Sequence, residues 1–431
     1  MTILASIPAL IKVAAVFVLV LIAIRKKISL GNAFLMGAVA LGIFFGLSIL
    51  AILHSFVAAI VEPKTLALAI IVSMILILSN SMESAGQMQR LLKNFRGLLK
   101  SPRLNLIVFP ALIGLLPMPG GAVFSAPMVK ELGAEAKIEP AKLSFINYWF
   151  RHIWEYWWPM YPGVLLGTLM ADLNLLVFMI CLCPLTAAAF YFGGLPVSGA
   201  FKFNKAQNSP DRPPLKPFAI ELLPILIAIV PGIGLGLIFT HFWPQLNIAK
   251  ETGLILALIA AILWIWRANR FSSTGIKKIV LNKQTAKMAY LVFAILMFKG
   301  VLTDSLAVGA IGLELTQLKV PLFMIAMSLP FIVGMVTGIT IAFVGSTFPI
   351  IIPLIHAHGQ EAFMLAYVML SLVCGFAGVL LSPLHLCLIL SNQYFKASTG
   401  EVYRLLWRPS LYLVVLSAIY FGLLHLLGRI G

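Results

Sequence analysis

Residues 109–122 read Phe-Pro-Ala-Leu-Ile-Gly-Leu-Leu-Pro-Met-Pro-Gly-Gly-Ala, and residues 329–340 read Leu-Pro-Phe-Ile-Val-Gly-Met-Val-Thr-Gly-Ile-Thr. Both stretches are apolar enough for a lipid bilayer, yet both contain the Pro and Gly that interrupt an α-helix. A broken backbone at membrane depth is tolerated only where protein or a water-filled cavity covers it. We therefore expect two re-entrant hairpins, over residues 104–129 and 320–355, each entering and leaving the membrane on one face.

The chain around these hairpins has the composition of a polytopic membrane protein. Hydrophobic residues fill 61% of its 431 positions and charged residues only 10%, whereas a soluble protein carries about 25% charged residues. Several apolar runs exceed the roughly 18 residues that mark a membrane span, which excludes a soluble fold. The net charge of +17 would suggest nucleic acid in a soluble protein, but here the basic residues lie in short loops between spans. We expect a lipid bilayer and no nucleic acid as the partner.

Ten further segments are predicted to cross the membrane. They cover residues 7–24, 31–53, 65–82, 141–170, 172–195, 218–241, 252–267, 286–304, 360–381 and 409–428. If the N-terminus lies outside, 24 of the 31 Lys and Arg residues fall on the inside and four on the outside. This bias follows the positive-inside rule, and it requires that neither hairpin crosses the membrane. Both termini are then predicted to lie outside.

Each half of the chain has the same plan of three spans, a hairpin and two spans. Because five crossings is an odd number, the second half is inverted relative to the first. The predicted fold is therefore an all-α membrane protein with two inverted-topology repeats, residues 1–195 and 218–431, joined by a cytoplasmic linker over residues 196–217. Broken helices at matching positions of inverted repeats are typical of the binding sites of secondary transporters.

The first tip (residues 117–121) and the second tip (residues 337–340) are the first candidate site. Half-helix N-termini aimed at the midplane attract anions, and exposed carbonyls at other half-helix ends can hold sodium. The alternative interpretation is that Gly and Pro here only permit close helix packing. The residues predicted to contact substrate are Pro119, Gly120, Gly121, Ser125, Arg151, Thr337, Gly338, Thr340, Ser346 and Thr347.

Three ionisable residues lie within a predicted span, in Asn-Tyr-Trp-Phe-Arg-His-Ile-Trp-Glu-Tyr-Trp-Trp-Pro-Met-Tyr-Pro-Gly at residues 147–163. An unpaired charge at this depth costs at least about 2.5–3.5 kcal/mol, and Arg151 and Glu155 are spaced to form a structural ion pair on one helix face. The functional alternative is that Arg151 attracts an anionic substrate while His152 or Glu155 exchanges protons. We expect this helix to break near residues 159–163, and its counterpart in the second half near residues 382–383.

The candidates for ion coupling combine the charged span with equivalent positions in the two halves. Glu83 and Asp304 end the third span of each half, where capping of the span is the alternative role. The full candidate set is Glu83, His152, Glu155, Asp304, Ser382 and His385. No metal site is predicted, because no second ligand pair accompanies His152 and Glu155, and Cys181 and Cys183 are interpreted as packing residues. No resident cofactor is expected, only Na⁺ or H⁺ as a coupling ion.

The segments Pro110–Val129 and Asn147–Gly163 resemble an uncharacterised prokaryotic family, domain of unknown function 401. That family is grouped with the ion transporter superfamily, which includes carriers of gluconate, citrate, dicarboxylates and arsenite, as well as sodium/proton carriers. The resemblance implies two inverted repeats with two hairpins, a homodimer, elevator-like movement of a transport domain and location in the cytoplasmic (inner) membrane. The Ser-Asn-Thr motif at each tip of the sodium-dependent dicarboxylate branch is replaced here by Pro-Met-Pro-Gly-Gly and Thr-Gly-Ile-Thr.

These features together predict a secondary active transporter of a small organic anion, coupled to protons or sodium, and not an enzyme. One alternative is a cation/proton antiporter of the same superfamily, in which Glu83, Glu155 and Asp304 carry the ion. Another, less favoured, is a membrane-embedded enzyme, since the sequence lacks a His-Glu-x-x-His motif, a nucleophile elbow and paired aspartates within spans.

Overall fold

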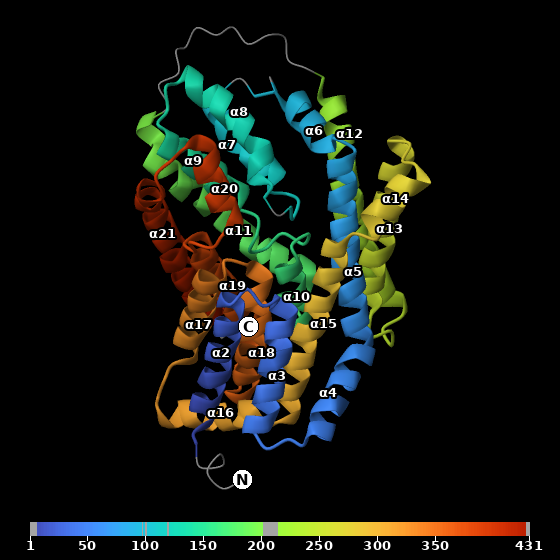
Figure 1. Cartoon of the computed structure of the whole chain (residues 1–431), viewed down its shortest axis with the longest axis vertical. Coiled ribbons are helices and arrows are strands. Elements are labelled where there is room, and N and C mark those ends of the chain that lie inside the picture. Colours follow the sequence, from blue (N-terminus) through green and yellow to red (C-terminus); the bar gives the residue numbers. More distant parts are fainter. Residues whose placement is uncertain (1–6, 97, 100, 119, 201–213, 428–431) are drawn as a thin grey trace.

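The computed structural model describes residues 7–96, 98–99, 101–118, 120–200 and 214–427, and every regular element in these ranges is helical (Figure 1). Eight of the described helical segments are long and apolar enough to cross a membrane, which confirms an integral membrane protein. Most of the predicted linker, residues 201–213, and the predicted site residue Pro119 lie outside the described residues.

The first half of the chain contains ten described α-helices and one 3₁₀ helix. They are α2 (Ala9–Arg25), α3 (Leu30–Phe44), α4 (Ile49–Val61), α5 (Pro63–Ser84), α6 (Gln87–Phe95), α7 (Pro102–Ile113), α8 (Ala122–Glu135), α9 (Pro140–Arg151), α10 (Pro162–Met170), α11 (Leu175–Gly194) and η1 (Leu195–Ala200).

The second half likewise contains ten described α-helices and one 3₁₀ helix. They are α12 (Leu215–Phe242), α13 (Ala249–Ala268), α14 (Ser273–Val280), α15 (Lys283–Asp304), α16 (Ala307–Gln317), α17 (Leu322–Thr337), α18 (Thr340–Ala357), η2 (Glu361–Phe363), α19 (Met364–Leu380), α20 (Leu386–Phe395) and α21 (Thr399–Leu427).

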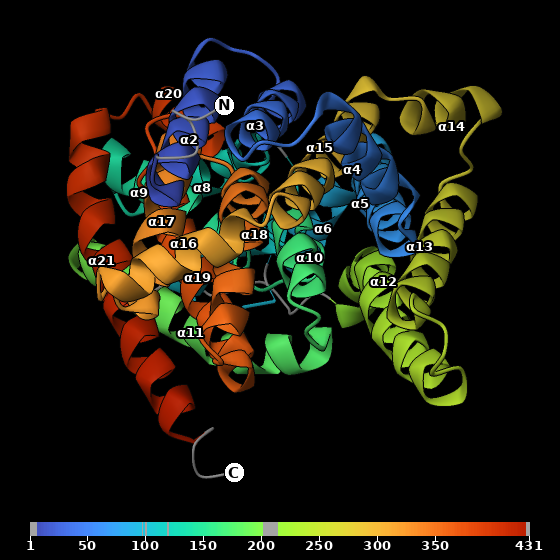
Figure 2. The same ribbon diagram turned by 90° about the horizontal axis from the view of Figure 1, so that it is seen from below.

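The helices form two packed groups, and each group draws on both halves of the sequence. The first body comprises α2–α5 and α12–α15, in which α15 packs on α3, α4 and α5 while α13 packs on α5 and α12. The second body comprises α7–α11 and α17–α21, with α19 packed against α17, α18 and α21. Figure 2 shows α3, α4 and α13 along one side of the molecule and α11, α19 and α21 on the other.

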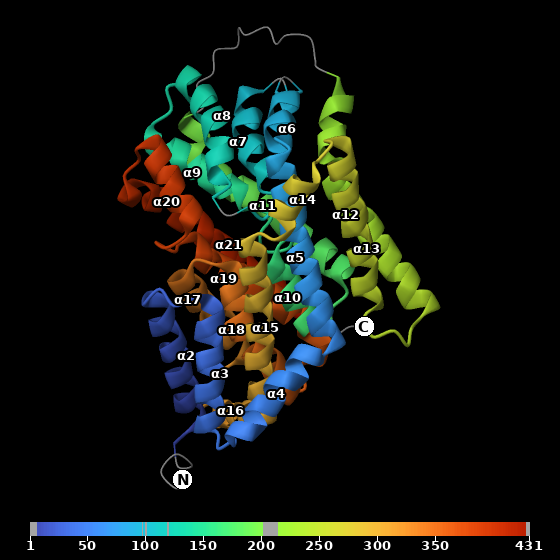
Figure 3. The same cartoon turned by 45° about the vertical axis from the view of Figure 1, so that its right-hand side comes forward.

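The boundary between the two bodies is narrow in comparison with the packing inside each of them. The most extensive contacts between them join α5 to α10, α15 to α18 and α2 to α17. Helices α6 and α16 lie in the sequence between helices of the first body and helices of the second. Helix α6 packs on α12, and α16 lies across the end of α18 and also contacts α2. Figure 3 shows α5 between α15 and α13, and it packs on both.

Each predicted hairpin segment forms two helices joined by a turn. Helix α7 packs on α8 and α17 packs on α18, so both chain reversals expected at the Pro- and Gly-rich stretches are present. At the second tip Gly338 has a φ of +66°, in the left-handed region that Gly adopts without steric cost. The return of each pair to one face of a membrane stays a prediction, as does the division into two repeats.

Two predicted spans are wrong as single helices. The span at residues 31–53 is divided into α3 and α4, because Gly46 adopts a φ of +81° and the side chain of Ser48 caps α4. The span at residues 141–170 is divided into α9 and α10 by residues 152–161, so the expected break begins earlier than Pro159. Pro162 then starts α10 at its first position, where a missing N–H costs nothing.

The other predicted break is confirmed, since α19 ends at Leu380 and α20 begins at Leu386. The last predicted span, residues 409–428, is only part of a longer helix. Helix α21 begins at Thr399 and carries Pro409 in its interior, so this proline does not start the span. The two breaks at residues 152–161 and 381–385 both lie in the second body, and this places them beside the two tips.

Candidate functional site

A cavity of about 320 Å³ lies where the two tips and the two helix breaks meet. Its polar side belongs to the second body. Its opposite wall is apolar and comes from the first body, through one residue of α3, one of α5 and two of α15. Its lining includes Met118, Gly120, Arg151, His152, Glu155, Tyr161, Gly338, Thr340, His385 and Cys387 from the second body, and Leu30, Leu76, Met288 and Leu291 from the first.

Arg151 is the last residue of α9 and holds the first tip. Its Nη2 donates a hydrogen bond to the carbonyl of Met118 at 2.6 Å, and its Nη1 donates to His152 Nε2 at 3.1 Å. The side chain is 2% exposed, and its Nε has no hydrogen-bond partner in the described part of the chain. A buried guanidinium with an unused N–H beside a cavity is suited to an anionic ligand, because an unsatisfied buried donor is costly.

The ion pair between Arg151 and Glu155, which was the structural alternative to a functional role, is not formed: the described structure contains no ion pair between them within 4.0 Å. The prediction assumed that both residues share a helix face. The helix ends at Arg151 instead, so the chain turns before Glu155 and the two side chains lie toward different tips. The interpretation of these charges as a self-neutralised pair is therefore removed.

Glu155 reaches the second tip. Its Oε1 accepts a hydrogen bond from Thr340 Oγ1 at 2.6 Å, and its Oε2 lies 3.9 Å from His152 Nε2. Thr340 is the first residue of α18, directly after the turn of the second tip. The start of the α9–α10 break thus places the Arg151 guanidinium at the first tip and the Glu155 carboxylate at the second tip.

The two helix breaks are joined by a pair of imidazoles. His152 Nδ1 lies 2.6 Å from the carbonyl of Tyr148, which can only accept, so this nitrogen carries the proton. His152 Nε2 then offers its lone pair to Arg151 Nη1 and to His385 Nε2, which lies 3.1 Å away. His385 precedes α20, so the contact connects the α9–α10 break to the α19–α20 break.

Aromatic side chains of the first break satisfy carbonyls at the end of α7. One of these carbonyls lies in the last turn of α7, where a helix leaves its last four C=O groups free, and the other two follow the helix directly. Trp154 Nε1, Trp158 Nε1 and Tyr161 Oη donate to them at 2.7–3.0 Å, and the acceptors are the carbonyls of Ala111, Leu115 and Gly114, respectively. The Trp-rich segment therefore fixes the first tip to the break, a role that its sequence alone did not reveal.

The comparison with protein families covers almost the entire chain. A family model described as a protein of unknown function (DUF401) matches residues 6–424.

The chain belongs to the DUF401 family.

No curated protein matches the sequence. The family assignment confirms the resemblance seen in the two motifs, and it carries no activity with it.

Seven of the residues predicted for this DUF401 protein line the cavity, and Gly121 lies against one of them, Arg151. A Cβ on Gly121 would come within 2.3 Å of Arg151 Nη2, so this glycine permits the close approach of the guanidinium to the first tip. The seven lining residues are Gly120, Arg151, His152, Glu155, Gly338, Thr340 and His385.

The remaining predicted residues serve local hydrogen bonding or lie elsewhere. The hydroxyls of three of them, Thr337, Ser346 and Thr347, donate to carbonyls of their own helices. Ser382 Oγ accepts from the backbone N–H of Leu384. Ser125 donates to Asn147 Oδ1 at 2.6 Å, and the Asn147 amide also binds Ser391 Oγ and so joins α8, α9 and α20.

Glu83 and Asp304 are not brought to the cavity. Glu83 ends α5 and lines a separate hollow beside α14, whereas the Asp304 carboxylate accepts a hydrogen bond from Ser55 of α4. Both lie in the first body. Helix α5 ends at Ser84, one residue after Glu83, whereas α15 ends at Asp304 itself, so the two carboxylates do not hold matching positions in the two helices.

Cys387 and Tyr161 line the cavity and were not predicted. Cys387 is the second residue of α20, just after the second break, and its Sγ and the ring nitrogens of His152 and His385 all lie within 4.8 Å of one another. No local sequence pattern indicated this group, because 233 residues separate the two histidines.

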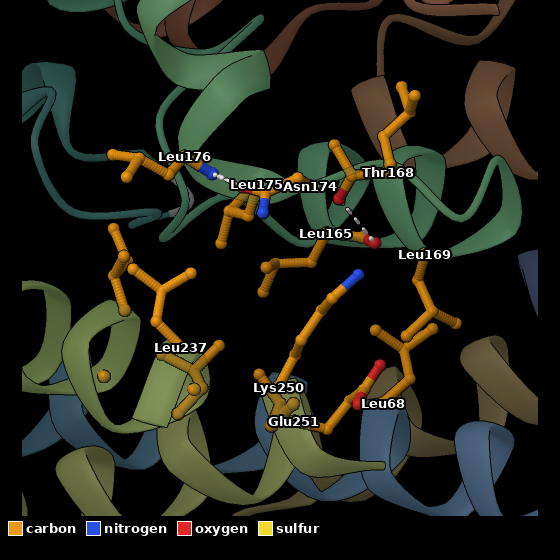
Figure 4. A pocket seen from close by; sticks show the side chains of 16 residues that line it. Leu68, Leu165, Thr168, Leu169, Asn174, Leu175, Leu176, Leu237, Lys250 and Glu251 are labelled. Atoms are coloured by element: carbon orange, nitrogen blue, oxygen red, sulfur yellow. Dashed lines mark hydrogen bonds between the residues drawn. The ribbon is translucent and has the colours of Figure 1, made fainter. Parts of the chain in front are cut away.

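A second, smaller hollow lies away from the tips, between α10 and α11 of the second body and α12 and α13 of the first (Figure 4). Lys250 and Glu251 face it from α13, as Figure 4 shows. Across the hollow, Thr168 donates to carbonyls of its own helix and Asn174 caps α11. This hollow marks an incompletely packed part of the boundary between the two bodies.

Proposed function

We propose that this DUF401 protein is a secondary active transporter of a small organic anion, and that the second body moves past the first like an elevator. The observation that carries the proposal is the polarity of the cavity. The charged and hydroxyl-bearing lining residues belong to the second body, and the facing wall consists of Leu30, Leu76, Met288 and Leu291. A wall without hydrogen-bonding side chains does not retain a polar solute, so the second body can carry the solute along it.

Matching elements support two repeats of opposite orientation. Helices α5 and α15 each have 22 residues, and both their ends are offset by 220 positions. A residue with positive φ follows each helix, Gly86 at +65° and Leu306 at +55°. Since the halves are related in this way and each carries five predicted spans, we infer inverted repeats with two re-entrant hairpins. We also infer that the repeats have the predicted boundaries at residues 195 and 218, and that the protein is a member of the ion transporter superfamily.

The arrangement favours an anion as the solute. Arg151 is buried, has an unused Nε donor and lacks a carboxylate partner within 4.0 Å among the described residues. An anion bound there would receive charge-assisted hydrogen bonds in a medium of low dielectric constant. We infer that a carboxylate of the solute lies beside Arg151 and the first tip.

Coupling to protons is proposed through Glu155, His152 and His385. Glu155 Oε2 lies 3.9 Å from His152 Nε2, and His152 Nε2 lies 3.1 Å from His385 Nε2. The three side chains therefore form a continuous row from the second tip to the second break. Histidine and carboxylate chains in membrane proteins are typical of proton relays. We favour protons over sodium because the described cavity lining offers few side-chain oxygens, chiefly the Glu155 carboxylate and the Thr340 hydroxyl.

A cation/proton antiporter is the second candidate, favoured by the presence of Glu155 in the cavity. In that case Glu155 would bind the transported cation and Arg151 would serve only as its counter-charge. Both candidates predict flux across a sealed membrane, which an enzyme does not require. We propose the absence of enzymatic activity, a homodimer and a prokaryotic inner-membrane location on the family resemblance alone.

A thermal-shift screen of purified protein with gluconate, citrate and succinate tests the anion. We expect at least one of them to raise Tm, equally in sodium and in choline buffer, and to be taken up by proteoliposomes along a pH gradient. Arg151→Gln should abolish the shift. Arg96→Gln removes an Arg from an exposed ion pair with Glu131, where both side chains are about half exposed, and should bind normally.

Retention of the carboxylate-induced shift in folded, monodisperse Arg151→Gln protein would contradict the proposed anion site. Proton efflux triggered by sodium or potassium, with no carboxylate uptake, would instead support the antiporter.

A further inference from the structure

Three side chains that commonly bind metals meet between the two helix breaks. His152 comes from the α9–α10 break, His385 comes from the α19–α20 break, and Cys387 is the second residue of α20. Their ligating atoms lie within 4.8 Å of one another, and all three residues are buried. We propose that this group, together with Glu155, is a binding site for a divalent metal ion of the zinc class.

The distances are close to those of a tetrahedral site. Zinc binds nitrogen at about 2.0–2.1 Å and sulfur at about 2.3 Å, so neighbouring ligand atoms stand roughly 3.3–3.6 Å apart. The Nε2 atoms of His152 and His385 are 3.1 Å apart. Glu155 Oε2 lies 3.9 Å from His152 Nε2, and the other carboxylate oxygen remains free to hold Thr340. The three-residue group is thus spaced for an ion, and the Glu155 carboxylate, which lies outside that group, must turn toward it to supply the fourth ligand.

His152 is already oriented for coordination. The carbonyl of Tyr148 holds its Nδ1–H at 2.6 Å, which leaves the Nε2 lone pair directed toward His385. A carbonyl in this position is the usual means by which proteins fix the tautomer of a ligating histidine. His385 binds through Nε2 after its proton moves to Nδ1, and Cys387 loses its thiol proton to solvent. The metal replaces Arg151 Nη1 at the lone pair of His152.

The charges of the ligand set offset those of the ion. A Cys387 thiolate and the Glu155 carboxylate supply two negative charges to a divalent cation, so the ion and its ligands together carry no net charge beside Arg151. Two imidazoles and a thiolate select zinc, cobalt(II) or cadmium over magnesium and calcium, which require oxygen ligands. The Cys181 and Cys183 pair is unsuited, because Cys181 is buried beside Tyr420 while Cys183 is exposed.

Cobalt(II) is the probe, added to the purified full-length protein in detergent. We expect one ion per chain, with visible ligand-field bands of tetrahedral cobalt, a near-ultraviolet thiolate-to-cobalt band and displacement by zinc. Cys387→Ser should remove the thiolate band, and His385→Gln should weaken binding by at least about 10-fold. Cys374→Ser, at a buried cysteine of α19 beside Ser417, is the matched control and should retain the spectrum.

Absence of stoichiometric cobalt binding to folded wild-type protein would overturn the proposal. A thiolate band that persists in Cys387→Ser, or that is lost in Cys374→Ser, would overturn it as well, because the thiolate would then come from another cysteine. These spectra are recorded without a transport assay, so their outcome is independent of the carboxylate screen. If both proposals hold, zinc should inhibit carboxylate binding in wild type and not in Cys387→Ser.

Discussion

Arg151 and Glu155 lie four residues apart, yet one binds the first tip and the other binds the second. The sequence predicted that both carry function, since ionisable residues inside a span are costly and need a purpose. It could not predict their partners, because these depend on the end of α9 at Arg151. Cys387 was missed for a related reason: its neighbour His152 comes from the other half of the chain.

Thr340 allows the role of the second tip to be measured at one hydroxyl. Thr340→Val keeps the volume and removes the donor to Glu155 Oε1, a charged hydrogen bond worth about 1.5–3 kcal/mol. We expect the affinity for the carboxylate found in the screen to fall by about 10-fold or more, measured by calorimetry at constant pH. The free carboxylate oxygen would then compete with the solute for Arg151.

Thr347→Val is the matched control for this measurement. Thr347 is equally buried in the same helix, but its hydroxyl donates to the carbonyl of Phe343 within α18. Its loss should leave affinity unchanged. Equal effects of the two substitutions would mean that Thr340 acts through general packing and not through Glu155.

At the scale of helices, Pro and Gly predicted both tips and the second break, because these residues act on the backbone locally. They did not predict where the first break begins. Residues 152–158 contain no Pro or Gly, and they leave the helix because Trp154, Trp158 and Tyr161 bind carbonyls at the end of α7. Such long-range hydrogen bonds override local propensity.

Gly114 tests the fit between α7 and the first break. A Cβ at this position would lie 1.9 Å from the carbonyl oxygen of Arg151, so Gly114→Ala must separate α7 from the end of α9. Overpacking of this kind costs about 1–3 kcal/mol. We expect a lower Tm in detergent and weaker binding of the carboxylate, since the first tip shifts away from Arg151.

Gly309→Ala in α16 provides the comparison, because a Cβ there meets nothing within 4 Å. This substitution should leave both the Tm and the affinity for the carboxylate unchanged. An unaltered Tm in Gly114→Ala would contradict the tight contact between α7 and α9.

For the whole molecule, hydropathy and charge predicted a polytopic helical protein with most spans placed correctly, because these signals are local in sequence. The grouping of α7–α11 with α17–α21 was not predictable from residue patterns. Apolar helix faces that pack on protein and those that face lipid have similar compositions, so only the contacts between elements reveal the two bodies.

The orientation of the chain can be tested at two exposed loops. Cysteines introduced at Asn247 and Ser272, in a Cys183→Ser background, lie on either side of α13. The bias of basic residues predicts that Asn247→Cys reacts with an impermeant maleimide in intact cells, whereas Ser272→Cys reacts only after the membrane is opened. Labelling of both in intact cells would contradict the outside N-terminus.

Movement of the two bodies predicts that a link across their boundary stops transport. Lys64 at the start of α5 forms an exposed ion pair with Asp172, after α10, with Nζ and Oδ1 3.2 Å apart. Lys64→Cys with Asp172→Cys, joined by a short bifunctional thiol reagent, should abolish carboxylate uptake and preserve carboxylate binding. Loss of the ion pair itself should matter little, because exposed pairs contribute at most about 1 kcal/mol.

A link inside one body should behave differently. Arg90 and Glu221 are paired at 2.8 Å between α6 and α12, on the side of the first body. Arg90→Cys with Glu221→Cys, joined by the same reagent, leaves the boundary free and should retain uptake. If the linked Lys64→Cys and Asp172→Cys protein transports as fast as its unlinked form, the bodies do not slide past each other at α5 and α10. The solute would then have to cross between the two tips while both bodies stay in place.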